Sequence, residues 1–334
     1  MIYYFFASAP LHAINISEFI KEKKILDYKI FINITNINYI DRQLLNTIKF
    51  LKLKNINKLY WSKFKILKLI QTHNFINNIK SQFNNKITFV ISDFRDFLFH
   101  QIRMYLNNSN FILIDDGNII FNIYKTYISK NIYFPFNQYN KFYISILKYI
   151  FPNTYKNLFN SKIIIYSFYK NFFRDKLIVK NKLKFIKKAL NCKSIQKNNS
   201  IVFILGTKLY ERGVLSLDQE IKILDKIKLY WRKKGKKLVY ISKRTTSDEK
   251  LKEIRKKLSI DYIKFNLPIE IALSAEYKKI PFAICSFGST ANITLKKIYN
   301  LSSYVFISKE IKNKIYKNNS NYLIYSKYSK IIKI

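Results

Sequence analysis

Two adjacent carboxylates at the end of an apolar run are the leading candidates for acid–base chemistry in this sequence. Asp115 and Asp116 follow the segment FILI and precede Gly117. Adjacent side chains on a strand point to opposite sides, so only one of the two is expected to face a ligand. A carboxylate at the carboxyl end of a strand can act as a general base. The pattern is also typical of an Asp that caps a helix, and spacing alone leaves both interpretations open.

A second candidate site follows the apolar segment FAIC. Ser286, Gly288, Ser289 and Thr290 lie between this predicted strand and a predicted helix. Hydroxyl groups and free backbone N–H groups at a helix N-terminus attract anions, which predicts a phosphate site. The alternative is that Ser289 only caps the helix.

Charged residues mark two further positions in the second half. Lys243 and Arg244 end a predicted strand and are suited to hold the same phosphate, although a solvated basic loop is the alternative in so basic a chain. Glu270 lies just after Pro268, at the start of a predicted helix, where the helix dipole favours an acidic residue whatever its function. Gly206 directly ends a strand and is one of only five glycines, which indicates a close approach of the backbone to a ligand.

Alternating apolar runs and amphipathic stretches predict parallel βαβ units. The predicted strands are 2–7, 28–34, 56–61, 87–91 and 111–114 in the first half, and 201–205, 237–242, 262–265, 282–286 and 304–307 in the second. The predicted helices are 11–22, 42–53, 63–82, 94–106, 248–258, 269–277 and 291–299.

A polar stretch before residue 201 separates two such series, so we predict an α/β protein with domains 1–196 and 197–334. Two Rossmann-like domains are expected to face each other across a cleft at the carboxyl ends of their strands, where nucleotides bind. The aromatic, basic region 131–173 is consistent with an acceptor surface, a membrane-facing surface or core.

The formal net charge is +41. Basic residues are scattered through every predicted helix, which favours a coding bias over a nucleic-acid-binding surface. The remaining field attracts polyanions such as a nucleotide, an anionic glycolipid or an acidic membrane surface. Two cysteines exclude a disulfide framework and give no metal-ligand spacing. No apolar run reaches the roughly 20 residues that span a membrane, and the start resembles a buried strand rather than a signal peptide, so a cytoplasmic location is expected.

Five segments in order resemble the bacterial sialyltransferases and the related capsule polysialyltransferases. They are ASAPLHAINISEFI, SDFRDFLFHQI with FILIDDGN, IVFILGTKLYERGVLSLDQEIKIL, PIEIAL, and CSFGSTANITLKKIYN. Two positions depart from the family pattern: His12 stands where glutamine is usual, and Lys243 stands where the family has histidine. The resemblance implies a GT-B fold of two domains.

The implied reaction is an inverting transfer of sialic acid from CMP-sialic acid to a surface glycan, with no metal or other cofactor. Asp115 is the implied base and Asp116 its support. The phosphate is implied to lie on Lys243, Arg244, Ser289 and Thr290, with Gly206, Ser286 and Gly288 nearby and Glu270 on the ribose.

The expected partners are a CMP-activated sugar, an anionic glycan or glycolipid acceptor and, peripherally, the inner membrane; nucleic acid is not expected. Three alternatives remain open. The first is another CMP-activated acid sugar, such as Kdo or legionaminic acid. The second is an inactive relative acting as a binding subunit. The third is a nucleic-acid-binding protein.

Overall fold

The computed structural model divides into two compact units, Met1–Leu183 and Lys184–Ile334. It describes all residues except 36, 62–64, 83–86, 106–108, 133–148, 150–162, 170–171, 174–176, 193 and 316–318. Most of the region 131–173 lies outside the described residues. Helix α8 (Lys184–Ala189) belongs to the second unit, where the Ser274 hydroxyl donates to the carbonyl of Leu190 just beyond it. The predicted boundary after residue 196 lies further along the chain.

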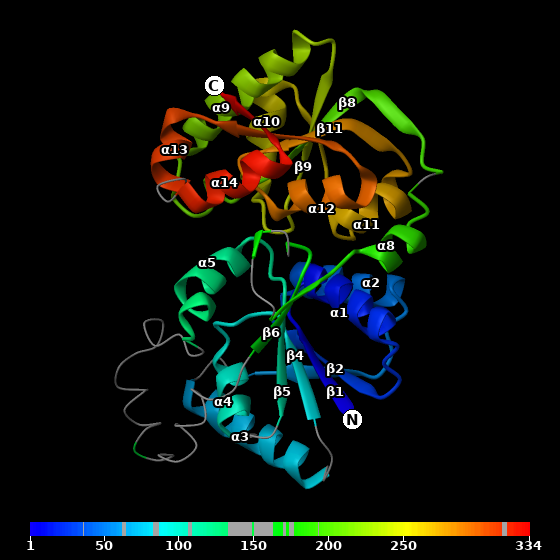
Figure 1. Ribbon diagram of the computed structural model, residues 1–334. Coiled ribbons are helices and arrows are strands. Elements are labelled where there is room, and N and C mark those ends of the chain that lie inside the picture. Colours follow the sequence, from blue (N-terminus) through cyan, green and yellow to red (C-terminus); the bar gives the residue numbers. More distant parts are fainter. Residues whose placement is uncertain are drawn as a thin grey trace. The chain divides into compact units, whose positions relative to one another are not determined.

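The first unit contains a parallel sheet with the strand order β3-β2-β1-β4-β5-β6-β7 (Figure 1). Its strands are β1 (Ile2–Ala7), β2 (Tyr28–Ile34), β3 (Ile56–Tyr60), β4 (Ile87–Ile91), β5 (Asn110–Ile114), β6 (Ile163–Ser167) and β7 (Ile178–Lys180). Because all described pairings are parallel, the carboxyl ends of these strands meet at one edge.

Helices cover both faces of this sheet. They are α1 (Pro10–Lys23), α2 (Asn38–Phe50), α3 (Lys65–Gln82), α4 (Phe97–Tyr105), α5 (Ile119–Thr126) and the short η1 (Ile128–Lys130). Phe5 of β1 contacts Phe19 of α1, whereas Phe6 contacts Phe75 of α3. Successive strand side chains point to opposite faces, so α1 and α3 lie on opposite sides of the sheet.

The second unit contains another parallel sheet, with the order β10-β9-β8-β11-β12-β13. Its strands are β8 (Lys197–Leu205), β9 (Lys237–Ile241), β10 (Asp261–Ile263), β11 (Ile280–Ser286), β12 (Ser302–Ile307) and β13 (Lys330–Lys333). Beyond α8, its helices are α9 (Leu217–Arg232), α10 (Asp248–Leu258), α11 (Ile269–Ala272), the π-helical turn η4 (Leu273–Tyr277), α12 (Thr290–Tyr299), α13 (Lys309–Ile315) and α14 (Asn319–Tyr328).

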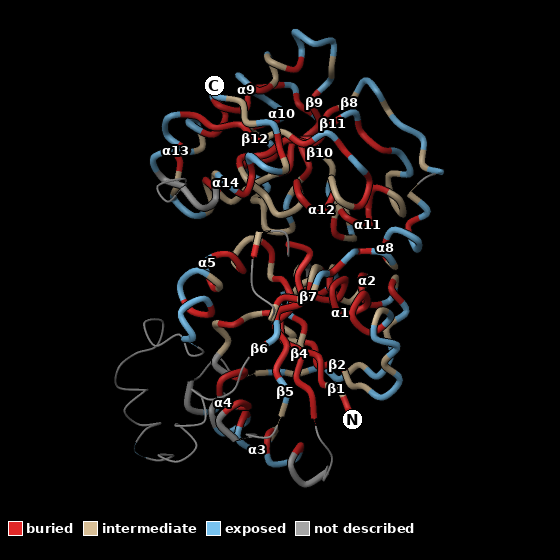
Figure 2. The backbone as a smooth tube through the Cα atoms, in the orientation of Figure 1, coloured by how far each residue is buried: buried red, intermediate tan, exposed pale blue. Residues whose placement is uncertain are grey.

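The central strands of both sheets are buried on both faces, as the tube in Figure 2 shows. Strand β4 is buried at every position, which explains why its sequence reads as a continuous apolar run. The α/β prediction with two Rossmann-like sheets is confirmed. The structure adds three strands that the sequence analysis did not predict, β6, β7 and β13, and β8 begins at Lys197 rather than at residue 201.

In the part of the chain that the structure describes, no helix combines the length and the apolar character needed to cross a membrane.

Candidate functional site

Asp115 and Asp116 occupy different environments at the carboxyl end of β5. The side chain of Asp115 is fully buried, and its Oδ2 accepts the backbone N–H of Phe168 at 2.7 Å. Its backbone carbonyl accepts the side-chain amide of Asn15 at 3.0 Å. Phe168 directly follows β6, the neighbour of β5, so the Asp115 carboxylate ties the ends of these two strands together.

Asp116 is the more accessible carboxylate, with 29% of its side chain exposed. One oxygen lies 2.9 Å from Nε2 of His12, and the other lies 3.5 Å from a terminal nitrogen of Arg95. His12 belongs to α1 after β1, and Arg95 follows β4. Strands β1, β4 and β5 are neighbours, and the three side chains therefore meet at their carboxyl ends.

The hydrogen bonds of His12 define which nitrogen carries its proton. The backbone N–H of Ser8 donates to Nδ1 at 3.2 Å, which makes Nδ1 an acceptor. Nε2 then carries the hydrogen that is donated to Asp116. Arg95 is held by Asp93 through two bonds, at 2.9 and 3.0 Å. Both partners of Asp116 are thus held in place by bonds of their own.

In the second unit, basic side chains gather at the carboxyl ends of β8 and β9. Lys243 and Arg244 follow β9, while Lys208 and Arg212 follow β8 beyond Gly206. Burial lowers the pKa of Lys243, and the positive charges of Lys208, Arg212 and Arg244 lower it further. These residues form the basic cluster. Cations that destabilise one another's charge create a region where an anion is bound favourably.

Gly206 has a steric role beside this cluster. A Cβ atom there would lie 2.7 Å from the Tyr240 hydroxyl and 2.9 Å from the Ile241 carbonyl. Its own N–H donates to that carbonyl at 2.9 Å. The need for glycine is therefore explained by close contact between the ends of β8 and β9, and its φ is not in the left-handed region.

A buried ion network supports the loop that carries Lys208 and Arg212. The ammonium of Lys250, in α10, lies 2.7 Å from Glu220 and 3.3 Å from Glu211, and donates to the Thr207 carbonyl at 2.8 Å. Lys250 and Glu220 are both completely buried. The network therefore joins α9 and α10 to the residues just after β8.

Replacing Lys250 by methionine is expected to destabilise the protein by about 3–5 kcal/mol, because two carboxylates lose their cation in the interior. The urea midpoint of unfolding of Lys250→Met measures this loss. Lys257→Met is the matched control, since Lys257 is 46% exposed and pairs only at the surface with Asp218 and Glu253. Equal midpoints for the two variants would contradict the structural role given to Lys250.

The turn between β11 and α12 leads into the N-terminus of α12 and is stabilised by hydrogen bonds of a buried serine. Ser286 is fully buried; its hydroxyl accepts the Gly288 N–H at 2.9 Å and donates to Asn292 at 2.6 Å. Gly288 has φ +110°, a conformation that disfavours other residues. Ser289 caps the helix by accepting the Ala291 N–H, and Thr290 is its first residue. Ser286 therefore holds the turn in its conformation, while Ser289 and Thr290 form the N-terminus of α12.

Glu270 lies beside the same helix. Its carboxylate accepts the Thr294 hydroxyl at 2.6 Å, and its backbone carbonyl accepts the Tyr299 hydroxyl at 2.8 Å. Glu270 is only 7% exposed, and burial raises the pKa of its carboxyl group. Thr294 is four residues beyond Thr290, so Glu270 is positioned within about one helical turn of the start of α12.

Strand order brings most predicted residues of the second unit to one edge. Strand β8 lies between β9 and β11, so Gly206, the basic cluster and the β11–α12 turn occupy three adjacent strand ends.

Sequence reasoning missed the functional potential of His12, Arg95, Lys208 and Arg212. The signal for Arg95 and His12 was their place in the first turns of the helices predicted to follow strands 87–91 and 2–7.

Among the residues described, no group of three or more His, Cys, Asp and Glu side chains could hold a metal ion.

No protein-family model matches the sequence, and no curated protein matches it. Solved structures do share its fold. A putative UDP-N-acetylglucosamine 2-epimerase from Listeria monocytogenes matches with a TM-score of 0.55 and 12% identity, over 97% of this chain and 86% of that one. The UDP-GlcNAc 2-epimerase of Methanocaldococcus jannaschii matches with a TM-score of 0.53 and 12% identity, over 100% of this chain and 89% of that one. A sialyltransferase from Photobacterium damsela matches with a TM-score of 0.51 and 12% identity, over 99% of this chain and 81% of that one. The chain thus has the GT-B-type fold that these nucleotide-sugar epimerases and glycosyltransferases share.

Proposed function

We propose that the protein is an inverting glycosyltransferase that moves sialic acid from CMP-sialic acid to a hydroxyl group of a glycan. The observation that carries this proposal is the basic cluster at the ends of β8 and β9, next to the β11–α12 turn. A phosphate fits there because neighbouring cations and a helix N-terminus both favour negative charge. The choice of sialic acid as the sugar rests on the resemblance of the five sequence segments to the bacterial sialyltransferases.

In the proposed reaction, Asp116 rather than Asp115 is the base. Its carboxylate is accessible and held by His12 and Arg95, whereas that of Asp115 is buried and occupied by the Phe168 N–H. Asp116 takes the proton of the acceptor hydroxyl as its oxygen forms a bond to the anomeric carbon. The bond from that carbon to the phosphate oxygen breaks, and its electron pair leaves with CMP.

The departing CMP gains negative charge on its phosphate, and the basic cluster stabilises this charge. Lys243 does so as a point charge, since a phosphate is a weak base and needs charge stabilisation more than a proton. Thr290 and Ser289 bind phosphate oxygens in the proposal. Glu270 binds the ribose hydroxyls, and its bond to Thr294 orients it.

Nucleotide release by the purified protein tests the proposal with three donors: CMP-sialic acid, CMP-Kdo and UDP-N-acetylglucosamine. We expect CMP release from CMP-sialic acid, increased by a neutral galactoside. Preferential use of CMP-Kdo would show that the transferred sugar is Kdo and would leave the proposed mechanism unchanged. Conversion of UDP-N-acetylglucosamine alone, or no reaction with any donor, would refute the proposal.

A further inference from the structure

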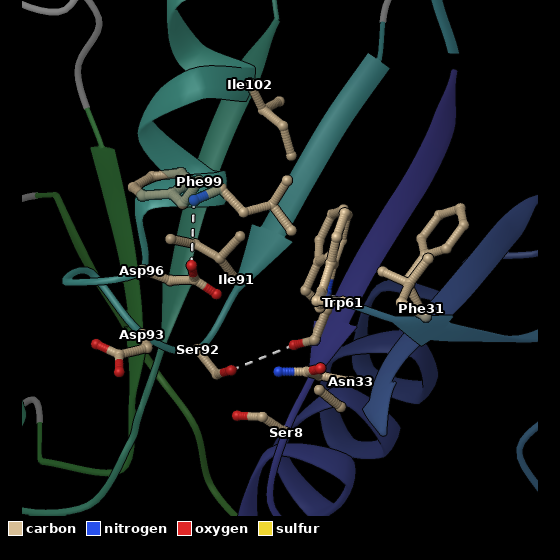
Figure 3. A pocket seen from close by; sticks show the side chains of 14 residues that line it. Ser8, Phe31, Asn33, Trp61, Ile91, Ser92, Asp93, Asp96, Phe99 and Ile102 are labelled. Atoms are coloured by element: carbon tan, nitrogen blue, oxygen red, sulfur yellow. Dashed lines mark hydrogen bonds between the residues drawn. The ribbon is translucent and has the colours of Figure 1, made fainter. Parts of the chain in front are cut away.

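The first unit contains a small cavity, open to solvent, that is lined by the ends of β1 to β4 and by α4. Figure 3 shows how its side chains lie. Ser8, Asn33 and Ser92 gather at one end, and Trp61 stands beside them. Buried apolar side chains, among them Phe99, form the opposite wall. The cavity is therefore polar at one end and aromatic along its side.

Trp61 offers a fixed aromatic surface to this cavity. Its ring meets Phe75 of α3 edge-on, at 6.2 Å between centroids. Phe75 in turn packs edge-on against Phe6 and Phe31, which also line the cavity. A sugar ring has an apolar C–H face and a rim of hydroxyl groups, so an aromatic wall with nearby amide and hydroxyl groups is suited to it.

The charge of the lining is opposite to that of the chain. Among the described residues that line the cavity, Asp93 and Asp96 are acidic and none is Lys, Arg or His. The chain as a whole has 61 Lys and Arg residues against 20 Asp and Glu. The guanidinium of Arg95 is paired with Asp93, a lining residue, and also lies beside Asp116. A carboxylate entering the cavity would meet like charge, which disfavours binding.

Two contacts connect the cavity to the proposed base. Ser8 lines the cavity, and its N–H donates to His12, which donates to Asp116. Asp93 lines the cavity and holds Arg95, which lies 3.5 Å from Asp116. A ring held in the cavity is thus bound by the same loops that position the carboxylate.

We infer that this cavity binds the terminal sugar of the acceptor as an uncharged, hydroxyl-rich ring packed on Trp61, and that Asp93 and Asp96 exclude sugar acids. The identity of the occupant as acceptor rests on the proposed function. The expectation of an anionic acceptor changes accordingly: acid groups can lie elsewhere on the glycan, but the ring in the cavity is neutral. A newly added sialic acid carries a carboxylate and is disfavoured in the cavity, so addition of a second residue to the same terminus is expected to be slower than the first.

Tryptophan fluorescence tests the inference directly. Trp61 is one of two tryptophans, and the other, Trp231, is buried in the second unit. We would titrate the full chain with two matched pairs: methyl β-galactoside and its galacturonide, and methyl β-glucoside and its glucuronide. At least one neutral sugar is expected to shift the emission and to bind at least tenfold more tightly than its acid partner. Failure of both neutral sugars to bind, or equal affinity of an acid partner, would overturn the inference.

Two substitutions locate the binding by calorimetry. Trp61→Ala is expected to weaken binding of the neutral sugar at least tenfold. Tyr60→Ala is the control, because Tyr60 is the adjacent aromatic residue, is 56% exposed and does not line the cavity. The double variant Asp93→Asn, Asp96→Asn is expected to reduce the difference between neutral and acid sugars. Equal weakening by Trp61→Ala and Tyr60→Ala would contradict the assignment.

Release of CMP from CMP-sialic acid, measured in the presence of the neutral sugar that binds, separates this inference from the proposed function. If selective, Trp61-dependent sugar binding occurs without CMP release, the cavity assignment holds and the proposed function fails. If CMP is released but neutral and acid sugars bind equally, the proposed function holds and the inference fails.

Discussion

Asp116→Asn is expected to lower the rate of glycosyl transfer by about 10²- to 10⁴-fold, the usual contribution of a general base. Asparagine keeps the size of the side chain and can still accept the Nε2–H of His12 at one oxygen. It cannot take a proton from an acceptor hydroxyl. Binding of CMP, which the proposal assigns to the second unit, should be unchanged. Single-turnover rates and CMP titration measure the two effects separately.

Asp115 provides the matched comparison at the adjacent position. Asp115→Ala leaves the Phe168 N–H without its acceptor in the interior, so we expect a loss of about 1–3 kcal/mol in stability. Asp115→Asn can preserve that bond and should retain much of the activity. If Asp115→Asn abolishes transfer while Asp116→Asn retains it, the base is Asp115, as the family resemblance implies.

His12 adds a second control for the same carboxylate. His12→Ala removes the donor at 2.9 Å from Asp116 but leaves the base in place, and we expect about a tenfold loss of transfer. His12→Gln supplies another N–H donor and should recover part of that loss. Because both variants keep Asp116, neither should reduce transfer as far as Asp116→Asn does.

Lys243→Ala is expected to lower transfer by about 10²- to 10³-fold, the usual cost of removing one group that stabilises developing negative charge. The effect should appear mainly in the chemical step, since Lys208, Arg212 and Arg244 remain to hold the ground-state phosphate. Lys243→His should restore part of the rate. If Lys243→Ala behaves like the unaltered protein, this residue does not contact the leaving group.

The pH dependence gives an independent test of Lys243. Its pKa is lowered by burial and by neighbouring cations, so without ligand it loses its proton at lower pH than an ordinary lysine. Binding of CMP, whose phosphate carries the negative charge that develops in the chemical step, should therefore weaken as pH rises through that pKa. Lys243→Arg keeps the charge at all these pH values and should remove the weakening. If CMP binding by Lys243→Arg weakens at high pH as it does in the unaltered protein, the group that titrates is not Lys243.

Sequence reasoning could predict the two sheets because buried parallel strands read as continuous apolar runs. The central strand β4 is a clear case, with all five positions buried. The edge strand β13 escaped prediction because it is a short, partly exposed segment, KIIK, at the end of the chain. Strand β6 is itself an apolar run, IIIYS, and it escaped because apolar and aromatic residues throughout region 131–173 leave its bounds unmarked.

The sequence could predict that the candidate site residues lie at the carboxyl ends of strands, but not how their side chains contact one another. Alternation continued beyond the end of β5 implies that Asp115 and Asp116 face different ways, but not which one is accessible. That choice depends on Phe168, which lies 53 residues further along the chain and directs its N–H at Asp115. The His12–Asp116 bond likewise joins residues 104 apart, and no local pattern encodes such a contact.

Proton NMR of a single reaction tests the central claim most directly, with unaltered protein, CMP-sialic acid and methyl β-galactoside. The proposed mechanism predicts a sialyl galactoside of inverted anomeric configuration, formed in equal amount with CMP. Retained configuration would contradict the single displacement with Asp116 as base. Intact CMP-sialic acid, in a sample that converts UDP-N-acetylglucosamine instead, would contradict the proposed function.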